Sequence, residues 1–284
     1  MYPESFEYHA PASLKEAVAL LGQYGDDAKI VTGGMSLIPM MKLRLAMPKH
    51  LIDLNKIKEL KGVAESGGKI TIGACTTYWE LESNATLLAK CPLLARAAAA
   101  VGDVQVRNRG TIGGSLVHND PAADLPAALI ALDAEITLMG KAERKMSARD
   151  FLVDSLTTAI KPDEVIAKIT VPSTSKSASY QKMAQQASGF ALVGVACALE
   201  ISGGKCASAR IGVTGVSSKA FRATAVEKAL MGKSLDAASI AAAAERIVAD
   251  AKDPLGDPLN ASPEYRLHLA QVYTRRAIEA AAKA

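Results

Sequence analysis

Hydrophobic and polar positions follow a helical period in several segments of this chain. The clearest begins behind a capping box formed by Ser13 and Glu16, where apolar residues recur at helical spacing from Leu14 to about Tyr24. Further apolar or alanine-rich segments predict helices over residues 37–45, 93–101, 224–230, 235–251 and 263–282.

Short apolar runs bounded by turn residues predict strands between these helices. Two pairs, Gly67-Gly68 and Gly203-Gly204, predict turns between strands, and we assign no ligand to Gly67-Gly68. The predicted strands cover residues 28–31, both arms of a hairpin at 63–72, and residues 136–139, 165–171, 190–201 and 209–216.

A serine-rich stretch after Pro172, residues 173–179, is the best candidate for a domain boundary. We therefore predict an N-terminal domain over residues 1–176, with subdomains of about 1–56 and 57–176. Residues 177–284 would form a C-terminal α+β domain.

Two glycine pairs closed by hydroxyl residues carry the strongest chemical signal. They are Thr32-Gly33-Gly34-Met35-Ser36 and Thr111-Ile112-Gly113-Gly114-Ser115, which we call the first and second glycine loops. Glycine lets backbone amides approach an anion closely, and the hydroxyls add donors. One Gly-Gly pair alone is more often an ordinary turn. Together the loops predict a site that grips a dinucleotide pyrophosphate from both sides.

The usual nucleotide motifs are absent, because the chain has neither G-x-G-x-x-G opening a βαβ unit nor G-x-x-x-x-G-K-[ST]. The first glycine loop is predicted to lie between a strand and a helix, where unsatisfied first-turn amides suit a pyrophosphate. A nucleotide fold other than the Rossmann or P-loop type is therefore expected.

Composition and charge exclude some functions without selecting one. The chain has 284 residues, 49% of them hydrophobic and 22% charged, which allows a substantial core. Its formal net charge of +4 is spread along the chain, so nucleic-acid binding is not expected. No apolar run is long enough for a membrane span, and the first residues lack the pattern of a signal peptide, so a cytoplasmic location is expected.

The sequence around both loops resembles one family. Residues 28–45, A-x-x-V-T-G-G-M-S-L-I-P-M-M-K-L-R-L, with His50 to Leu54 behind them, resemble the first flavin loop of the medium subunit of molybdenum-containing hydroxylases. Residues 102–114 and 120–126 resemble the second flavin loop, and the likeness continues to residues 264–277. The likeness is greatest to carbon monoxide dehydrogenase medium subunits, within the xanthine dehydrogenase family.

The resemblance implies a fold and a function. The fold would be an FAD-binding region of two subdomains, of the PCMH or vanillyl-alcohol-oxidase type, followed by the C-terminal domain. The chain would be an oxidoreductase subunit that binds FAD and passes electrons to an external acceptor. A small subunit with [2Fe–2S] clusters and a large subunit with a molybdopterin cofactor would be its partners, in a heterotrimer that forms a dimer.

The scattered cysteines and histidines are consistent with iron–sulfur clusters and molybdenum being bound by other subunits. Cys75, Cys91, Cys197 and Cys206 lie far apart, so this chain lacks the organised thiolates that an iron–sulfur cluster needs. The four histidines show no spacing of two histidines and a carboxylate, so we expect no bound metal. No Ser-His-Asp triad or pair of carboxylates is recognisable. We expect no catalytic residue in this chain, because the flavin would carry out the redox chemistry.

The resemblance also implies which part of FAD individual residues would contact. Val101 would lie beside adenine, Asp124 would bind a sugar or ribityl hydroxyl, and Ile166 and Lys182 would lie near the isoalloxazine ring. Asp124 could instead cap a helix, and Lys182 could be a solvated surface residue. The full set of expected FAD-binding residues is Val31, Thr32, Gly33, Gly34, Met35, Ser36, Val101, Thr111, Gly113, Gly114, Ser115, Asp124, Ile166 and Lys182.

Three places depart from the family pattern. Ser188-Gly189-Phe190 stands where the family has an acidic residue. Met35 replaces a polar residue or glycine, and Ser115 replaces an asparagine. Arg107 and Arg109 could support the phosphates or face a partner subunit. Two alternatives stay open: a self-sufficient FAD oxidoreductase and a non-catalytic nucleotide-binding scaffold. Neither the substrate of the complex nor its electron acceptor follows from the sequence.

Overall fold

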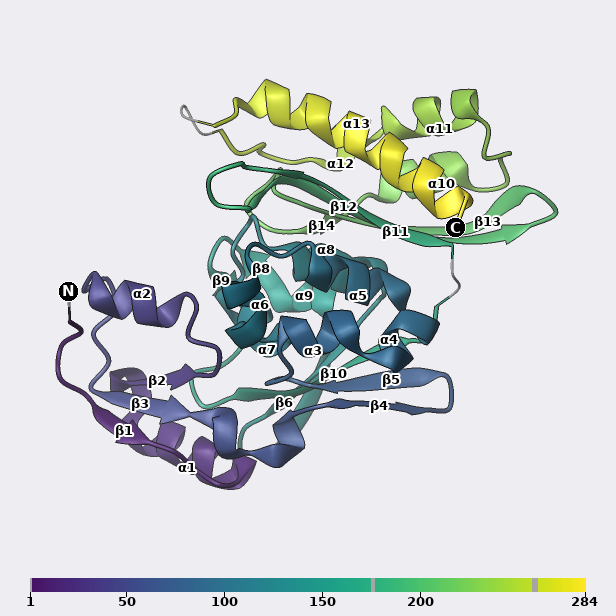
Figure 1. Ribbon diagram of the computed structural model, residues 1–284. Coiled ribbons are helices and arrows are strands. Elements are labelled where there is room, and N and C mark those ends of the chain that lie inside the picture. The colour runs from purple at the N-terminus through teal and green to yellow at the C-terminus, as the bar shows by residue number, and fades with distance from the viewer. Residues whose placement is uncertain (1, 175–176, 257–259) are drawn as a thin grey trace.

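The computed structural model describes residues 2–174, 177–256 and 260–284, which form three regions in chain order (Figure 1). We call them the N-terminal lobe, the middle region and the C-terminal region. The predicted boundary at residue 176 lies outside the described residues. Within the described residues, no helix is long and apolar enough to cross a membrane.

The N-terminal lobe is a small parallel sheet with strand order β1-β3-β2. Its helix α1 is capped as predicted, because the Ser13 side chain accepts a hydrogen bond from the Glu16 amide. The Glu16 carboxylate bonds the amide of Ala12 rather than that of Ser13. The elements are β1 (Glu7–His9), α1 (Leu14–Tyr24), β2 (Ala28–Val31), α2 (Leu37–Lys42), β3 (His50–Asp53) and the 3₁₀ turns η1 (Gly25–Asp27), η2 (Leu54–Lys56) and η3 (Lys58–Leu60).

The middle region is a five-stranded antiparallel sheet of order β4-β5-β10-β6-β7, covered by helices that come from the long connection between β5 and β6. Its strands are β4 (Val63–Ser66), β5 (Lys69–Gly73), β6 (Glu135–Met139), β7 (Glu143–Ser147) and β10 (Val165–Pro172), with a separate pair β8 (Leu152–Asp154) and β9 (Thr157–Thr158). Its helices are α3 (Tyr78–Ser83), α4 (Ala85–Lys90), α5 (Pro92–Ala99), α6 (Val104–Arg109), α7 (Ile112–His118), α8 (Asp124–Ala131) and α9 (Ala148–Phe151).

The C-terminal region is a four-stranded antiparallel sheet between two helical layers (Figure 1). The long helix α13 packs across β11 and β12 on one face, while α5 and α8 of the middle region pack against the other. Its elements are β11 (Ala178–Ala184), β12 (Ala191–Ser202), β13 (Lys205–Thr214), β14 (Phe221–Arg222), α10 (Thr224–Leu230), α11 (Ala237–Ala244), α12 (Ile247–Asp250) and α13 (Pro263–Ala282).

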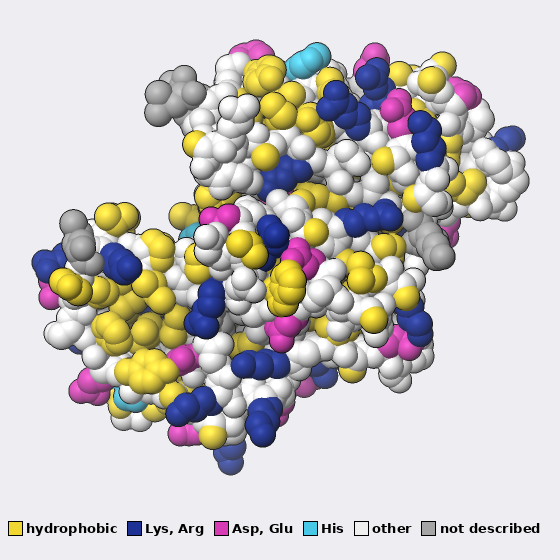
Figure 2. Space-filling model, viewed as in Figure 1, with side chains coloured by type: hydrophobic (Ala, Val, Ile, Leu, Met, Phe, Trp, Pro, Cys, Tyr) yellow, Lys and Arg dark blue, Asp and Glu magenta, His cyan; other side chains and the backbone are white. Residues whose placement is uncertain are grey.

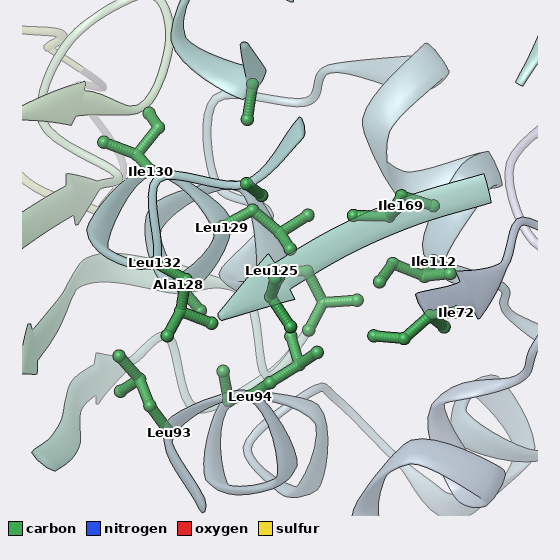
Figure 3. Packing of buried hydrophobic residues seen from close by; sticks show 14 of the residues in the cluster. Ile72, Leu93, Leu94, Ile112, Leu125, Ala128, Leu129, Ile130, Leu132 and Ile169 are labelled. Carbon is green, nitrogen blue, oxygen red and sulfur yellow. The ribbon is translucent and has the colours of Figure 1, made fainter. Parts of the chain in front are cut away.

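One hydrophobic cluster joins the middle and C-terminal regions. Leu125 and Leu129 of α8 lie near Leu94 of α5 and Ile169 of β10 in the buried core (Figure 3). The same cluster reaches into the C-terminal sheet at Tyr180. Burial of this apolar surface holds the two regions together, since transfer out of water stabilises by about 25 cal/mol per Å².

The predicted elements are largely confirmed, with one clear exception. The predicted helix over residues 235–251 is two helices, α11 and α12. Asp236 caps the first by accepting from the Ser239 amide, so the helix begins after it. At its end the Arg246 amide bonds the Ala243 carbonyl, three residues back, and this tighter turn interrupts the α-helical ladder.

Candidate functional site

The two glycine loops share a cavity of about 580 Å³ between the N-terminal lobe and the middle region. This volume lies within the range of small-molecule and cofactor sites. All the predicted FAD-binding residues except Lys182 line it. The two loops, far apart in sequence, thus meet in one place, as their pairing predicted.

The first glycine loop follows β2 and leads into α2, as expected. Val31 ends the strand with a buried side chain, and Ser36 precedes the first helical residue. Within the described chain, the backbone amides of Gly33, Gly34, Met35 and Ser36 donate no hydrogen bond. Because unpaired amides at a buried or partly buried site need an acceptor, this run of donors is suited to an anionic group.

The glycines of the first loop are required by space and by backbone conformation. A Cβ on Gly33 would lie 2.1 Å from the Arg109 carbonyl oxygen, so the first loop packs directly against the backbone at the end of α6, just before the second loop. Gly34 has a φ of +72°, in the left-handed region that favours glycine. Met35, one of the departures from the family pattern, lines the cavity and is 38% exposed.

The second glycine loop is built differently from the expectation. Thr111 caps α7, because its side chain accepts a hydrogen bond from the Gly114 amide at 3.1 Å. The Gly113 amide donates to the Ala74 carbonyl at 2.9 Å, and the Ser115 amide donates to the Thr111 carbonyl at 3.0 Å. These amides already have partners inside the protein, so this loop offers the cavity its side chains and close backbone packing. The unpaired amides belong to the first loop.

A direct hydrogen bond joins the two loops, because the hydroxyl oxygens of Thr32 and Thr111 lie 2.9 Å apart. Within the N-terminal lobe, the Asn55 side chain donates to the Thr32 carbonyl at 2.9 Å and so holds Thr32 at this contact. Sequence reasoning missed Asn55, which lies just after β3. The N-terminal lobe is therefore fixed to the middle region at the cavity wall.

Asp124 and Lys182 form a buried ion pair beside the cavity. The Lys182 Nζ lies 2.8 Å from Asp124 Oδ2, and the Tyr180 hydroxyl donates to Asp124 Oδ1 at 2.6 Å. The side chains of Lys182 and Asp124 are only 8% and 5% exposed, respectively. Burial raises the pKa of the Asp124 carboxyl, and the Lys182 ammonium opposes that rise.

Both simple alternatives for this pair are wrong. Ala123, not Asp124, is the N-cap residue of α8, and Asp124 makes no capping bond. Lys182 is not a solvated surface residue, since it donates to Asp124 and to the Ala100 carbonyl. Lys182 thus reaches the site through Asp124, which does line the cavity.

Further wall residues were not predicted. The ring of Tyr78 packs against Gly110, because a Cβ added to Gly110 would lie 2.5 Å from the ring. Burial raises the pKa of the Tyr78 hydroxyl to about 12. A capping box of Thr77 and Glu80 begins its helix, a sequence signal that could have located it. Glu164, also on the wall, is held by Arg144 at 2.6 Å.

Arg107 does not point its charge at the cavity as a phosphate ligand would. Its Nε lies 3.0 Å from Glu82 Oε2. It also donates to the carbonyls of Val101 and Gly102, each at 3.0 Å. Arg107 therefore positions the Val101 segment of the wall.

Comparison with known families divides the chain into two matched segments. Residues 4–174 match the FAD binding domain in molybdopterin dehydrogenase. Residues 178–281 match the CO dehydrogenase flavoprotein C-terminal domain. Together these matches cover nearly the whole chain.

Individual relatives agree. The carbon monoxide dehydrogenase medium chain of Hydrogenophaga pseudoflava is 41% identical, over 99% of this chain and 98% of that protein. Subunit alpha of the 6-hydroxypseudooxynicotine dehydrogenase complex of Paenarthrobacter nicotinovorans is 36% identical, over 98% and 95%.

A solved structure agrees as well. Carbon monoxide dehydrogenase from H. pseudoflava, in a form that lacks the Mo-pyranopterin moiety of the molybdenum cofactor, superposes with a TM-score of 0.95. Its chain is 43% identical, and the match covers 99% of this chain and 98% of that one. The predicted α+β fold, an FAD-binding domain followed by a C-terminal domain, is confirmed. This chain belongs to the family of FAD-binding medium subunits of molybdopterin dehydrogenases, which are oxidoreductases.

Proposed function

We propose that this chain holds FAD across the cavity and serves as the exit for electrons from a molybdenum hydroxylase complex. One observation carries the proposal: the two glycine loops form one cavity wall, and the first loop presents a run of unpaired amides to it. A dinucleotide has a pyrophosphate that such donors would bind.

The residues fit the parts of FAD in the following way. The amides from Gly33 to Ser36 would bind the pyrophosphate, with the Thr32 and Ser115 hydroxyls nearby as further donors. Val101 would contact the adenine. Ile166, which is buried apart from its cavity side, would pack near the isoalloxazine ring.

Asp124 would bind a sugar or ribityl hydroxyl, because a carboxylate accepts hydrogen bonds from such groups. Lys182 and Tyr180 engage one carboxylate oxygen each and fix the direction of the remaining lone pairs. Lys182 therefore acts as a positioning residue and keeps a positive charge behind Asp124. When bound, FAD supplies the redox chemistry that links one-electron iron–sulfur clusters to an external acceptor.

The electrons are proposed to come from other chains. All four cysteines are buried and free, and burial raises the pKa of Cys75 to about 12 and of Cys91 to about 11. Neutral, separated thiols do not hold an iron–sulfur cluster. We therefore propose a small iron–sulfur subunit and a large molybdenum subunit as partners, in a dimer of heterotrimers.

The surface of the N-terminal lobe supports such an assembly. Figure 2 shows hydrophobic side chains gathered over this lobe. The exposed ones in its sequence include Leu43 at 60%, Leu45 at 71% and Met47 at 61%. Large exposed apolar patches mark interaction sites, so we propose that a partner subunit covers this one. The cytoplasmic location expected from the sequence stays a prediction.

The substrate is proposed to be set by the large subunit rather than by this chain. Relatives of similar identity carry the names of enzymes for carbon monoxide and for 6-hydroxypseudooxynicotine. Similar chains thus occur with different substrates.

Purification from the native host tests the proposal. An affinity tag on this chain should recover two further subunits together with FAD, iron and molybdenum in fixed ratios. Recovery of this chain with FAD but without iron and molybdenum would contradict the proposed complex and favour a self-sufficient flavin enzyme. Recovery without FAD would contradict the proposed cofactor.

A further inference from the structure

The side chains of two histidines and a glutamate meet within the N-terminal lobe, outside the cavity that the glycine loops line. We infer that Glu7, His9 and His50 form a zinc site. Spacing along the sequence did not indicate this site, because His9 and His50 lie on different strands and are 41 residues apart in the chain.

Strand pairing explains how the three side chains meet. β1 and β3 pair in parallel, with Glu7 opposite His50 and His9 opposite Ile52. Glu7 and His9 are two residues apart on β1, so their side chains share one face of the sheet. His50 lies beside Glu7 on that face. The backbone places all three groups together before any side chain adjusts.

The distances between donor atoms bracket those expected around a small tetrahedral ion. His9 Nε2 lies 3.1 Å from His50 Nδ1, and Glu7 Oε2 lies 3.4 Å from His50 Nδ1 and 4.0 Å from His9 Nε2. Ligand atoms about 2.0–2.2 Å from a tetrahedral zinc ion are about 3.3–3.6 Å apart. Two imidazoles and one carboxylate favour zinc over magnesium or calcium, which prefer oxygen ligands alone.

Tyr24 holds the imidazole rings in place. Its ring stacks on that of His50 with centroids 3.7 Å apart and an angle of 14°, and on that of His9 at 5.0 Å and 29°. The histidine side chains are 20% and 16% exposed for His9 and His50, whereas that of Glu7 is 73% exposed. The ion can therefore enter from solvent on the Glu7 side, and water can complete the fourth position.

The inferred zinc site is separate from the glycine loops. His50 pairs with Ala28 at the amino end of β2, whereas the first glycine loop follows Val31 at the other end, about 10 Å away along the strand. A zinc ion here joins β1, a strand of three residues at the edge of the sheet, to the central strand β3. It therefore stabilises the lobe without taking part in electron transfer.

Metal titration of the full-length chain without a histidine tag tests this inference. After treatment with a chelator, the protein is incubated with Zn²⁺, passed through a desalting column and assayed for metal. We expect one zinc ion per chain and a rise of about 5 °C in Tm. Cobalt in place of zinc should show the visible absorption of a tetrahedral site.

Matched variants decide the outcome. His9→Gln and His50→Gln should each lose the zinc equivalent and the rise in Tm, while His268→Gln, an exposed histidine of α13, should keep both. FAD binding shows that each variant is folded. If the wild type takes up no zinc, or if the two cluster variants take up as much as the wild type, the inference is wrong and the histidines form only a hydrogen-bonded pair.

Discussion

The hydroxyl oxygens of Thr32 and Thr111 lie 2.9 Å apart, although 79 residues separate them along the chain. One belongs to the N-terminal lobe and the other caps a helix of the middle region. The cavity between the glycine loops therefore exists only when the two regions are docked. Changes at this contact should affect both stability and cofactor binding.

Replacement of Thr111 by valine tests this contact. The variant loses the cap of α7 and the bond to Thr32. Loss of a capping side chain costs about 1 kcal/mol, which urea denaturation measures. FAD affinity should fall by about tenfold, because the docking bond is lost as well. Thr86→Val, in α4, is the control and should bind FAD like the wild type.

Gly33, which packs against the backbone at the end of α6, should not tolerate a side chain. In Gly33→Ala the new Cβ would lie 2.1 Å from the Arg109 carbonyl oxygen, so the first loop must move away from α6. We expect a loss of more than about 2 kcal/mol in the free energy of unfolding. Gly22→Ala, in α1 with no atom near the new Cβ, should instead stabilise by about 0.5–1 kcal/mol. Equal effects of the two changes would contradict the packing described.

Lys182→Met should destabilise the protein in a way that depends on pH. Burial already raises the pKa of Asp124, and loss of the Lys182 ammonium raises that pKa further. A raised carboxyl pKa favours the folded state at low pH, and this contribution is lost as the pH rises through the folded pKa. The deficit relative to wild type should be small near pH 4 and about 3–5 kcal/mol at pH 7.

Lys145→Met is the control for this experiment. Lys145 pairs with Glu135 at 3.0 Å, but both side chains are about half exposed. Such surface pairs contribute about 0–1 kcal/mol. A deficit for Lys182→Met that does not change between pH 4 and pH 7 would show that Asp124 is not ionised beside it.

Glu164→Gln should have the opposite pH dependence. The Arg144 guanidinium, whose bonds to the carboxylate are 2.6 and 2.7 Å long, holds the pKa of Glu164 below its usual value. The stability from this pair is present above the unfolded pKa of about 4.3 and is lost as the pH falls through the lowered value. The variant should be about 2 kcal/mol less stable at pH 7 and approach the wild type in acid. Glu135→Gln, in the exposed pair, should change little at either pH.

The local elements could be predicted from the sequence because their signals are local. The capping residues Ser13 and Asp236 and the turns at Gly67 and Gly203 act within a few residues. The break after Ala244 could not be predicted, since no proline or glycine marks it.

The site was predicted only in part, for a physical reason. The glycine loops are continuous in sequence, so their residues could be identified. The roles of their amides depend on distant partners such as Ala74, which accepts from the Gly113 amide. Likewise, the ion pair of Asp124 with Lys182 and the meeting of His9 with His50 depend on strand and helix packing.

The most direct test is a titration of the purified chain with FAD and with FMN, followed by flavin fluorescence. Ser115→Trp, which places a large side chain in the cavity, serves as the blocked variant, and Thr86→Val as the control. We predict tight binding of FAD but not FMN by the wild type and the control, and loss of FAD binding in a folded Ser115→Trp. Equal binding of FAD and FMN, or FAD binding unchanged by Ser115→Trp, would contradict a dinucleotide site between the two glycine loops.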